Sequence, residues 1–327
     1  MRHVRLGSSD LEVSVVALGC GNFGGVGSAP DLVGRGDDEA TAFALMDAAR
    51  ERGITLFDTA NSYGLGRSEE MVGRWLASRR ARDEVVLSTK VRNRVGPAPE
   101  DEGLSARHIR RQVEASLRRL GTDRIDLYLA HDPDPAVPLP ETMTAFDELV
   151  RAGKAGHVGL SNFDGSQVAE AATIAARGGL TPVANLQSGY SLLDRAVATD
   201  VLDVCARHGI GFTAYSPLAG GWLTGRYRPG QPYPRGSRMA LRPDPYRGLE
   251  RPAAFAAIAA LRRAAAEWGV DLPTLALAWV LTDPGVSAVI VGPRRPEHLG
   301  PALAALRLEL SEAEREGLAG AVRAEGL

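Results

Sequence analysis

Four polar residues of complementary acid–base chemistry follow short apolar runs in the first 131 residues. They are Asp58, Tyr63, Lys90 and His131. Hydride delivery to a carbonyl carbon leaves an alkoxide that needs a proton donor, and tyrosine is a donor whose ordinary pKa is ~10. We expect the Lys90 ammonium to lower the pKa of Tyr63 toward the working range, because a neighbouring cation favours the phenolate. We expect Asp58 to keep Lys90 charged and oriented, and His131 to donate a hydrogen bond to the substrate oxygen.

Each of these residues, taken alone, also has a purely structural explanation. Asp58 is suited to cap the turn after its strand, and Tyr63 is suited to packing with its hydroxyl satisfied. Lys90 would serve as a solvated strand end, and His131 as a loop residue that bonds the backbone. Their joint position at successive strand ends favours catalysis, because these ends converge on one face of an α/β barrel.

Eight short apolar runs alternate with helical patterns along the chain, as expected for parallel strands buried on both faces. The predicted strands are 15–18, 54–57, 84–87, 125–129, 156–160, 182–186, 210–214 and 287–291. Eight such units predict a closed (β/α)8 TIM barrel, with a doubly wound open sheet as the alternative. We expect one domain over residues 1–327, extra C-terminal helices, and an N-terminal β-hairpin over residues 4–13 that plugs the barrel floor.

One glycine motif points elsewhere. Gly19-Cys20-Gly21-Asn22-Phe23-Gly24 satisfies the GxGxxG pattern directly after the first predicted strand. In a Rossmann domain the third glycine opens a helix whose N-terminus binds pyrophosphate. Here Gly24 is followed by more loop sequence, so we interpret the motif as a loop at the C-terminal end of the first strand.

The composition gives no sign of nucleic acid or a membrane as a partner. The net charge is -2, with 38 basic and 40 acidic side chains, and no block of like charge stands out. No run approaches the ~20 apolar residues of a membrane span, and the N-terminus lacks a signal-peptide pattern. Cys20 and Cys205 lack metal-ligand spacing and are expected to be free thiols. We expect a cytoplasmic protein without a metal.

The motifs around the four polar residues resemble those of the aldo-keto reductases over nearly the whole chain. Phe57 to Gly64 resembles the family's Asp-to-Tyr signature, Leu87 to Lys90 its lysine strand, and Asp126 to His131 its histidine strand. The resemblance implies that Asp58, Tyr63, Lys90 and His131 are the catalytic tetrad, with Tyr63 as the proton donor. This agrees with the chemical argument from the residues themselves.

The resemblance also implies a site for NADPH. Ser161, Asn162 and Gln187 would contact the nicotinamide amide, and Tyr215 would stack on its ring. The segment Ser216, Pro217, Leu218 and Gly220, with Arg226, would cover the pyrophosphate. Gly292, Arg294, Arg295 and His298 resemble the adenosine end, where Arg294 first and Arg295 second would bind the 2′-phosphate. The chain departs from the family at His298, Pro301 and Ala302, so the adenine contacts are not predicted.

The substrate side is less determined. Asn22, Phe23 and Trp222 are candidate substrate contacts, with Tyr233 and Tyr246 as further lining or packing residues. The Pro/Gly/Arg-rich segment 225–252 is a candidate lid. The leading hypothesis is NADPH-dependent reduction of an aldehyde or ketone, such as a sugar or an aromatic carbonyl compound. The alternatives are a cofactor-binding, redox-sensing regulatory subunit and a sugar dehydratase or epimerase with recycled cofactor. The sequence predicts neither the physiological substrate, the reaction direction nor the oligomeric state.

Overall fold

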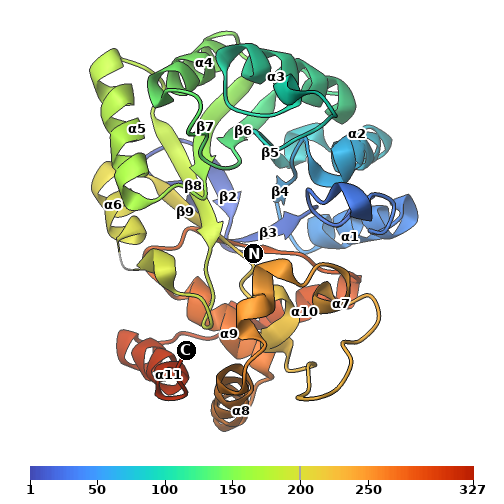
Figure 1. Cartoon of the computed structure of the whole chain (residues 1–327), viewed down its shortest axis with the longest axis vertical. Coiled ribbons are helices and arrows are strands. Elements are labelled where there is room, and N and C mark those ends of the chain that lie inside the picture. Colours follow the sequence, from blue (N-terminus) through green and yellow to red (C-terminus); the bar gives the residue numbers. More distant parts are fainter. Residues whose placement is uncertain (199) are drawn as a thin grey trace.

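A computed structural model shows a closed barrel of parallel strands surrounded by helices (Figure 1). The structure describes residues 1–198 and 200–327. The barrel strands are β3 (Val16–Gly19), β4 (Leu56–Asp58), β5 (Val86–Val91), β6 (Ile125–Ala130), β7 (Ala155–Ser161), β8 (Val183–Gly189), β9 (Gly211–Tyr215) and β10 (Ala288–Val291). Strand β10 pairs with both β9 and β3 and so closes the ring. The predicted barrel is confirmed, and closure excludes the open sheet.

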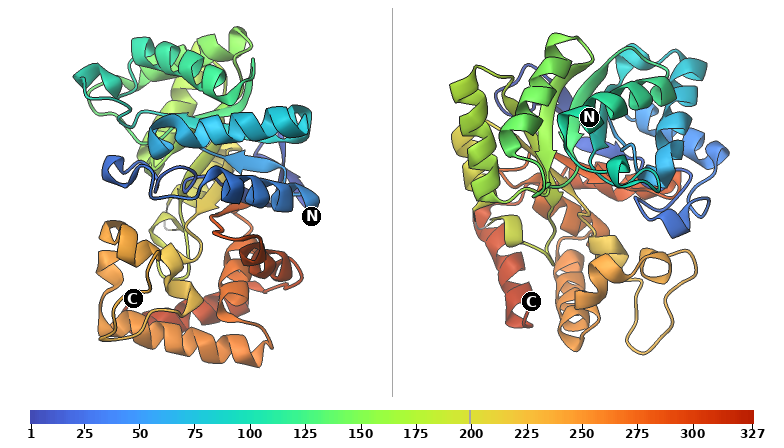
Figure 2. Two further views of the ribbon diagram at one scale, coloured as in Figure 1. Left: turned by 90° about the vertical axis from the view of Figure 1, so that its right-hand side faces the viewer. Right: turned by 45° about the horizontal axis from the view of Figure 1, so that its top comes forward.

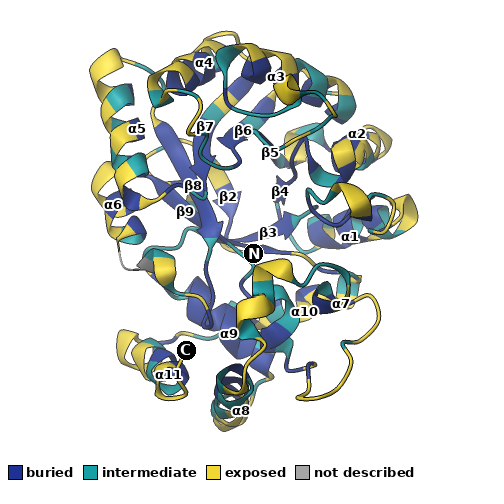
Figure 3. Cartoon of the chain, viewed as in Figure 1, coloured by how far each residue is buried: buried dark blue, intermediate teal, exposed yellow. Residues whose placement is uncertain are grey.

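Helices cover the outside of the barrel with their apolar sides inward (Figure 3). They are α1 (Glu39–Glu51), α2 (Arg67–Arg79), α3 (Ala106–Leu120), α4 (Leu139–Arg151), α5 (Gly165–Gly178), α6 (Val201–His208), α7 (Arg238–Leu241), α8 (Pro252–Glu267), α9 (Leu272–Leu281), α10 (Gly300–Ala305) and α11 (Glu312–Ala324). Local sequence sets their ends. Asp38 caps α1 by accepting from Thr41 N at 2.9 Å, and Gly121 ends α3 with a φ of 63°.

The predicted N-terminal hairpin forms and seals one end of the barrel. Strands β1 (His3–Arg5) and β2 (Glu12–Ser14) pair antiparallel. Leu6 and Val13 are 0% exposed and join the apolar cluster inside the barrel. This cluster includes Leu56, at the start of β4. Because the hairpin occupies the N-terminal ends of the strands, the C-terminal ends remain for chemistry.

Two strands begin two residues later than the sequence pattern predicts. The predicted runs 54–57 and 84–87 become β4 and β5, which start at Leu56 and Val86. Ile54 and Val85 are buried, but they lie in the turns that lead from a helix into each strand. An apolar run indicates which residues are buried and not which residues pair in the sheet. The predicted strand therefore begins before the first paired residue.

Two long loops meet at the C-terminal end of the barrel. The loop after β3 contains the GxGxxG motif and continues to α1, so Gly24 opens no helix. The segment 225–252 carries α7. Its Arg238 donates to Asn22 Oδ1 at 3.2 Å, which joins it to the loop after β3. The two loops lie on the same side of the molecule (Figure 2). Among the described helices, none has the length and apolarity needed to cross a membrane.

Candidate active site

The structure brings the four predicted catalytic residues together at the C-terminal ends of β4, β5 and β6. Lys90 Nζ, in β5, donates to Asp58 Oδ2 at 2.6 Å and to Thr59 O at 2.8 Å. Lys90 Nζ also lies 5.1 Å from the centroid of the Tyr63 ring. The Tyr63 and His131 ring centroids are 5.5 Å apart, in an edge-to-face arrangement. These residues therefore form one contiguous group built on neighbouring strands.

The Asp58 carboxylate is fixed by three side chains. Besides the Lys90 ammonium on one oxygen, Oδ1 accepts from Ser88 Oγ at 3.1 Å and from Gln187 Nε2 at 3.0 Å. Ser88 was not among the residues singled out in the sequence. The signal for it is strand alternation, because Ser88 and Lys90 are two residues apart in β5 and share a face. Gln187, expected at the nicotinamide amide, supports Asp58 in this structure.

The net pKa direction of Tyr63 corrects the sequence expectation. Burial raises its pKa above the ordinary value, the Lys90 charge lowers it, and the Asp58 charge raises it. The effect of Lys90 has the expected sign, but burial outweighs it. For Lys90 itself, burial lowers the pKa, whereas Asp58 and Tyr63 raise it, and the net direction is upward. The site therefore holds a charged lysine beside a protonated tyrosine.

The surroundings of His131 favour the neutral imidazole. Burial lowers its pKa well below the ordinary value, and the charges of Lys90, Arg92 and Arg242 lower it further. Within the described part of the chain, its buried Nδ1 has no hydrogen-bond partner. An unpaired buried N–H is costly, which favours the proton on Nε2. His131 is thus suited to donate one hydrogen bond without delivering a full charge.

The residues predicted to hold the nicotinamide lie beside His131. Ser161, the last residue of β7, pairs in register with Gln187 of β8. Asn162 Nδ2 donates to His131 O at 3.0 Å, and Asn162 Oδ1 accepts from Tyr215 OH at 2.8 Å. Asn162 adopts a left-handed conformation with φ 62°, which an asparagine tolerates better than most residues. The hydrogen-bonded group of Asn162, Tyr215 and His131 joins the predicted amide site to the tetrad.

The segment after β9 has the tightly turned backbone that an anion site needs. Left-handed φ values occur at Ser216, Ala219, Gly220 and Gly221. A Cβ added at Gly220 would lie 2.5 Å from the Tyr246 ring, so this turn requires glycine. Ser216 Oγ lies 2.8 Å from Tyr246 OH. The N–H groups of Ala219 and Gly221 donate to Ser216 O and Leu218 O within the segment. Turns of this kind can also form concave sites for anions, so the segment is compatible with the expected pyrophosphate contact. Pro217 is buried and Leu218 half-buried within the same segment.

Basic residues gather at the predicted adenosine end. Burial lowers the pKa of His298, and the charges of Arg226 and Arg295 lower it further, so these groups share one positive field. Arg226, Arg295 and the preceding Gly292 are exposed. Arg294 Nε instead pairs with Asp37 Oδ1 at 2.8 Å. The guanidinium groups of Arg226 and Arg295 have the donors and the charge that suit a phosphate.

The departures from the family pattern lie next to these basic residues. Pro301 is half-buried and Ala302 is buried at the start of α10. Ala302 is packed inside and has no polar side-chain group with which to bond an adenine edge. Among the described residues, no group of three histidine, cysteine, aspartate or glutamate side chains is placed to hold a metal ion.

The candidate substrate contacts are mostly packed inside. Trp222 is 0% exposed and packs against Tyr227, Tyr233 and Phe255. Phe23 is 1% exposed. Asn22 is bonded to Arg238 of the 225–252 segment. These contacts give Trp222 and Phe23 a packing role. Asn22 follows Gly21, where an added Cβ would lie 3.5 Å from the Tyr63 ring.

The chain is similar in sequence to known proteins over nearly its whole length. The model of the Aldo/keto reductase family matches residues 16–322. The chain belongs to the aldo/keto reductase family. It is 37% identical to a protein of Bacillus subtilis described as uncharacterized oxidoreductase YrpG, over 95% of this chain and 93% of that protein. This match confirms the family resemblance inferred from the sequence motifs. It supports an oxidoreductase that acts on carbonyl compounds with a nicotinamide cofactor.

Two further relatives of this aldo/keto reductase carry more specific descriptions. An Arabidopsis thaliana protein described as a probable voltage-gated potassium channel subunit beta is 36% identical, over 91% of this chain and 89% of its own. The L-glyceraldehyde 3-phosphate reductase of Escherichia coli is 32% identical, over 91% of this chain and 86% of its own.

 All of these matches span nearly the whole of this chain, so the barrel and the loops that carry the candidate site lie inside the compared region.

Proposed function

We propose that this chain reduces an aldehyde or ketone to an alcohol with NADPH, and that Tyr63 is the proton donor. The observation that carries the proposal is the position of Tyr63 between the Lys90 ammonium and the neutral His131. This arrangement offers a proton beside a fixed positive charge. A developing alkoxide needs both.

Each member of the group has a separate task in this proposal. The bound nicotinamide cofactor supplies the hydride. His131 donates a hydrogen bond that positions the carbonyl oxygen, and Tyr63 transfers its hydroxyl proton to that oxygen. Lys90 stabilises the phenolate that remains, and Asp58 holds Lys90 in place through the 2.6 Å contact. Ser88 and Gln187 keep the carboxylate oriented.

The cofactor preference is a prediction that starts from the basic residues after β10. Replacing Arg294 and Arg295 together by alanine is expected to weaken NADPH binding by at least about 10- to 100-fold, because the loss of one charge-assisted bond to phosphate already costs roughly 1.5–3 kcal/mol. NADH binding should change much less, since its free 2′-hydroxyl offers no phosphate. Fluorescence titration with both cofactors measures the two dissociation constants.

The ion pair between Arg294 and Asp37 supplies a matched control. Asp37→Asn removes the carboxylate charge from this pair while both arginines remain, so the preference for NADPH should persist. Equal losses of NADPH and NADH in the double arginine variant would place the 2′-phosphate elsewhere.

The pKa directions predict the pH profile of reduction. His131 is neutral above its ordinary value of 6.5, because its pKa is lowered. Tyr63 stays protonated up to its ordinary value of 10, because its pKa is raised. Both groups are in their working form across this window, so kcat for reduction should be flat there and fall only at higher pH. Oxidation needs the phenolate and should rise with pH. A step in the reduction profile near neutrality would contradict these assignments.

A spectrophotometric assay at 340 nm with NADPH over aldehydes, ketones and sugars tests the proposed reaction. Turnover with net NADPH consumption supports it, whereas product formation without net consumption would support a dehydratase or epimerase. The relative described as a potassium channel subunit beta favours a second candidate, a cofactor-binding regulatory subunit. Tight NADPH binding with very slow cofactor exchange and negligible turnover would support that candidate instead.

A further inference from the structure

Three arginines without a carboxylate partner surround the catalytic group. They are Arg92, which follows β5, and Arg238 and Arg242, which belong to the 225–252 segment. In the part of the chain that the structure describes, none of the three forms a salt bridge. All three side chains are half-buried, where an unpaired charge is less well solvated than at the surface.

Arg92 is placed beside His131 by the backbone. The carbonyl of Val91, the preceding residue, accepts from His131 N at 2.8 Å. Arg92 has a φ of 133°, a conformation that costs energy for an L-residue and often marks a functional site. Its buried Nε has no hydrogen-bond partner within the described residues. The guanidinium thus retains a donor beside the residue that positions the carbonyl oxygen.

Arg242 approaches the catalytic group through the backbone that contacts the residue after Tyr63. A Cβ added at Gly27 would lie 2.6 Å from a terminal guanidinium nitrogen of Arg242, so the guanidinium packs directly on that glycine. The carbonyl of Gly27 accepts from Gly64 N at 3.1 Å, and Gly64 follows Tyr63. The charges of both Arg92 and Arg242 also contribute to the low pKa of His131, as expected if both face the catalytic group.

Arg238 is closer to the cofactor side. It bonds Asn22, and burial lowers its pKa, with the charges of Arg242 and Arg294 lowering it further. One carboxylate, Asp132, lies near enough to Arg92 for the arginine charge to oppose the rise of its pKa on burial, and its Oδ1 accepts from Asn162 at 2.9 Å. It supplies one negative charge beside three arginines. The positive charge around the group is therefore incompletely neutralised, and an anion would relieve the repulsion among the arginines.

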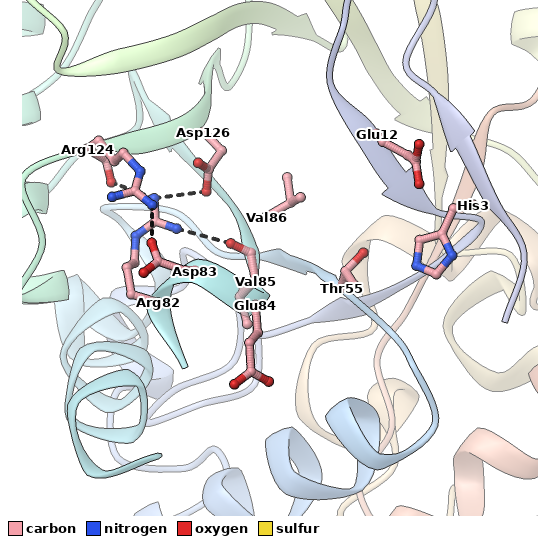
Figure 4. A pocket seen from close by; sticks show the side chains of 10 residues that line it. All are labelled: His3, Glu12, Thr55, Arg82, Asp83, Glu84, Val85, Val86, Arg124 and Asp126. Carbon is pink, nitrogen blue, oxygen red and sulfur yellow. Dashed lines mark hydrogen bonds and ion pairs between the residues drawn. The ribbon is translucent and has the colours of Figure 1, made fainter. Parts of the chain in front are cut away.

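The arginines of the pocket at the opposite end of the barrel, unlike Arg92, Arg238 and Arg242, have carboxylate partners. This pocket of 340 Å³ is lined by residues that include Arg82, Asp83, Arg124 and Asp126 (Figure 4). There Arg82 pairs with Asp126 at 2.9 Å and Arg124 pairs with Asp83 at 2.5 Å. The arginines of that pocket are neutralised within the protein, so it does not call for an anionic ligand.

We propose that Arg92 and Arg242 bind an oxyanion, a phosphate or a carboxylate, carried by the carbonyl substrate. This inference rests on the proposed function and narrows its substrate class to anionic aldehydes or ketones. Arginine suits the role because its planar donors bind oxyanions in pairs. Binding the anion at a fixed distance from His131 would place the carbonyl next to Tyr63.

Matched substrates test the proposal. We would compare glyceraldehyde 3-phosphate with glyceraldehyde, and succinic semialdehyde with butanal, in the wild-type enzyme and in Arg92→Gln and Arg242→Gln. The wild type should prefer the anionic member of at least one pair, and that pair identifies phosphate or carboxylate. In each variant, the ratio of kcat/KM for the anionic to the neutral substrate should fall about 10- to 100-fold. Arg247→Gln is the control, because Arg247 is exposed and pairs with Asp244, and its ratio should not change.

Two further measurements distinguish a failure of this inference from a failure of the proposed function. The NADPH dissociation constant of each variant should stay close to that of the wild type, and a loss there equal to the loss in the ratio would assign the arginines to the cofactor. Binding of glycerol 3-phosphate or succinate in the presence of saturating NADP+ tests the oxyanion site without turnover. Retained, arginine-dependent binding in a protein that reduces nothing would reject the proposed function alone. An unchanged ratio together with no such binding would overturn this inference.

Discussion

Tyr63→Phe is expected to lower kcat for carbonyl reduction by about 10²- to 10⁴-fold, the usual contribution of a positioned general acid. The change deletes one hydroxyl group and keeps the ring that lies 5.5 Å from the His131 ring and 5.1 Å from Lys90 Nζ. Packing around the site should survive, because phenylalanine has nearly the same shape. NADPH affinity should also survive. Initial rates at saturating substrate, together with fluorescence titration of NADPH, measure the two quantities.

Tyr233→Phe is a matched control for this substitution. It deletes a tyrosine hydroxyl that bonds Glu250 within the 225–252 segment, and its ring packs against Trp222 and Tyr227. Its kcat should remain close to that of the wild type. If Tyr63→Phe kept full activity, another group would have to be the proton donor. If Tyr63→Phe lost NADPH binding to the same extent as turnover, its role would be structural.

The sequence could predict the barrel and the grouping of the four candidate residues because both depend on strand ends. Asp58 and Lys90 each stand at the end of a recognisable apolar run, and the ends of neighbouring parallel strands meet. The residues predicted from the family resemblance also lie on such ends, as Ser161 and Tyr215 do. Position along a strand is therefore the part of the site that local sequence specifies.

The sequence pattern could not predict how deeply the site residues are buried or which loops contact one another. The pKa of Tyr63 depends on how completely the folded loops enclose it, and that enclosure reverses the net direction expected from Lys90 alone. Trp222 is a residue type that often lines pockets, but its neighbours bury it completely. Arg242 reaches Gly27 across more than 200 residues of chain, and no spacing rule connects such positions.

Lys90→Met is expected to produce the second large effect, a loss of both activity and stability. Methionine removes the ammonium that stabilises the Tyr63 phenolate, so kcat should fall by roughly 10²-fold or more. It also leaves the Asp58 carboxylate, which is 4% exposed, without its cation. Breaking a buried ion pair on one side typically costs about 3–5 kcal/mol, because the remaining charge is uncompensated. Urea denaturation gives the change in the free energy of unfolding.

The double variant Lys90→Met with Asp58→Asn separates the two roles of the pair. Neutralising Asp58 removes the uncompensated charge while its amide can keep partners in Ser88 and Gln187, the side chains that bond Oδ1 in the wild type. Much of the lost unfolding free energy should return, since replacing both members of a buried pair is often close to neutral. Activity should not return, because no cation remains beside Tyr63. Recovery of both activity and stability would show that Lys90 supports only the fold, whereas recovery of stability alone identifies the charge of Lys90 as the part that catalysis requires.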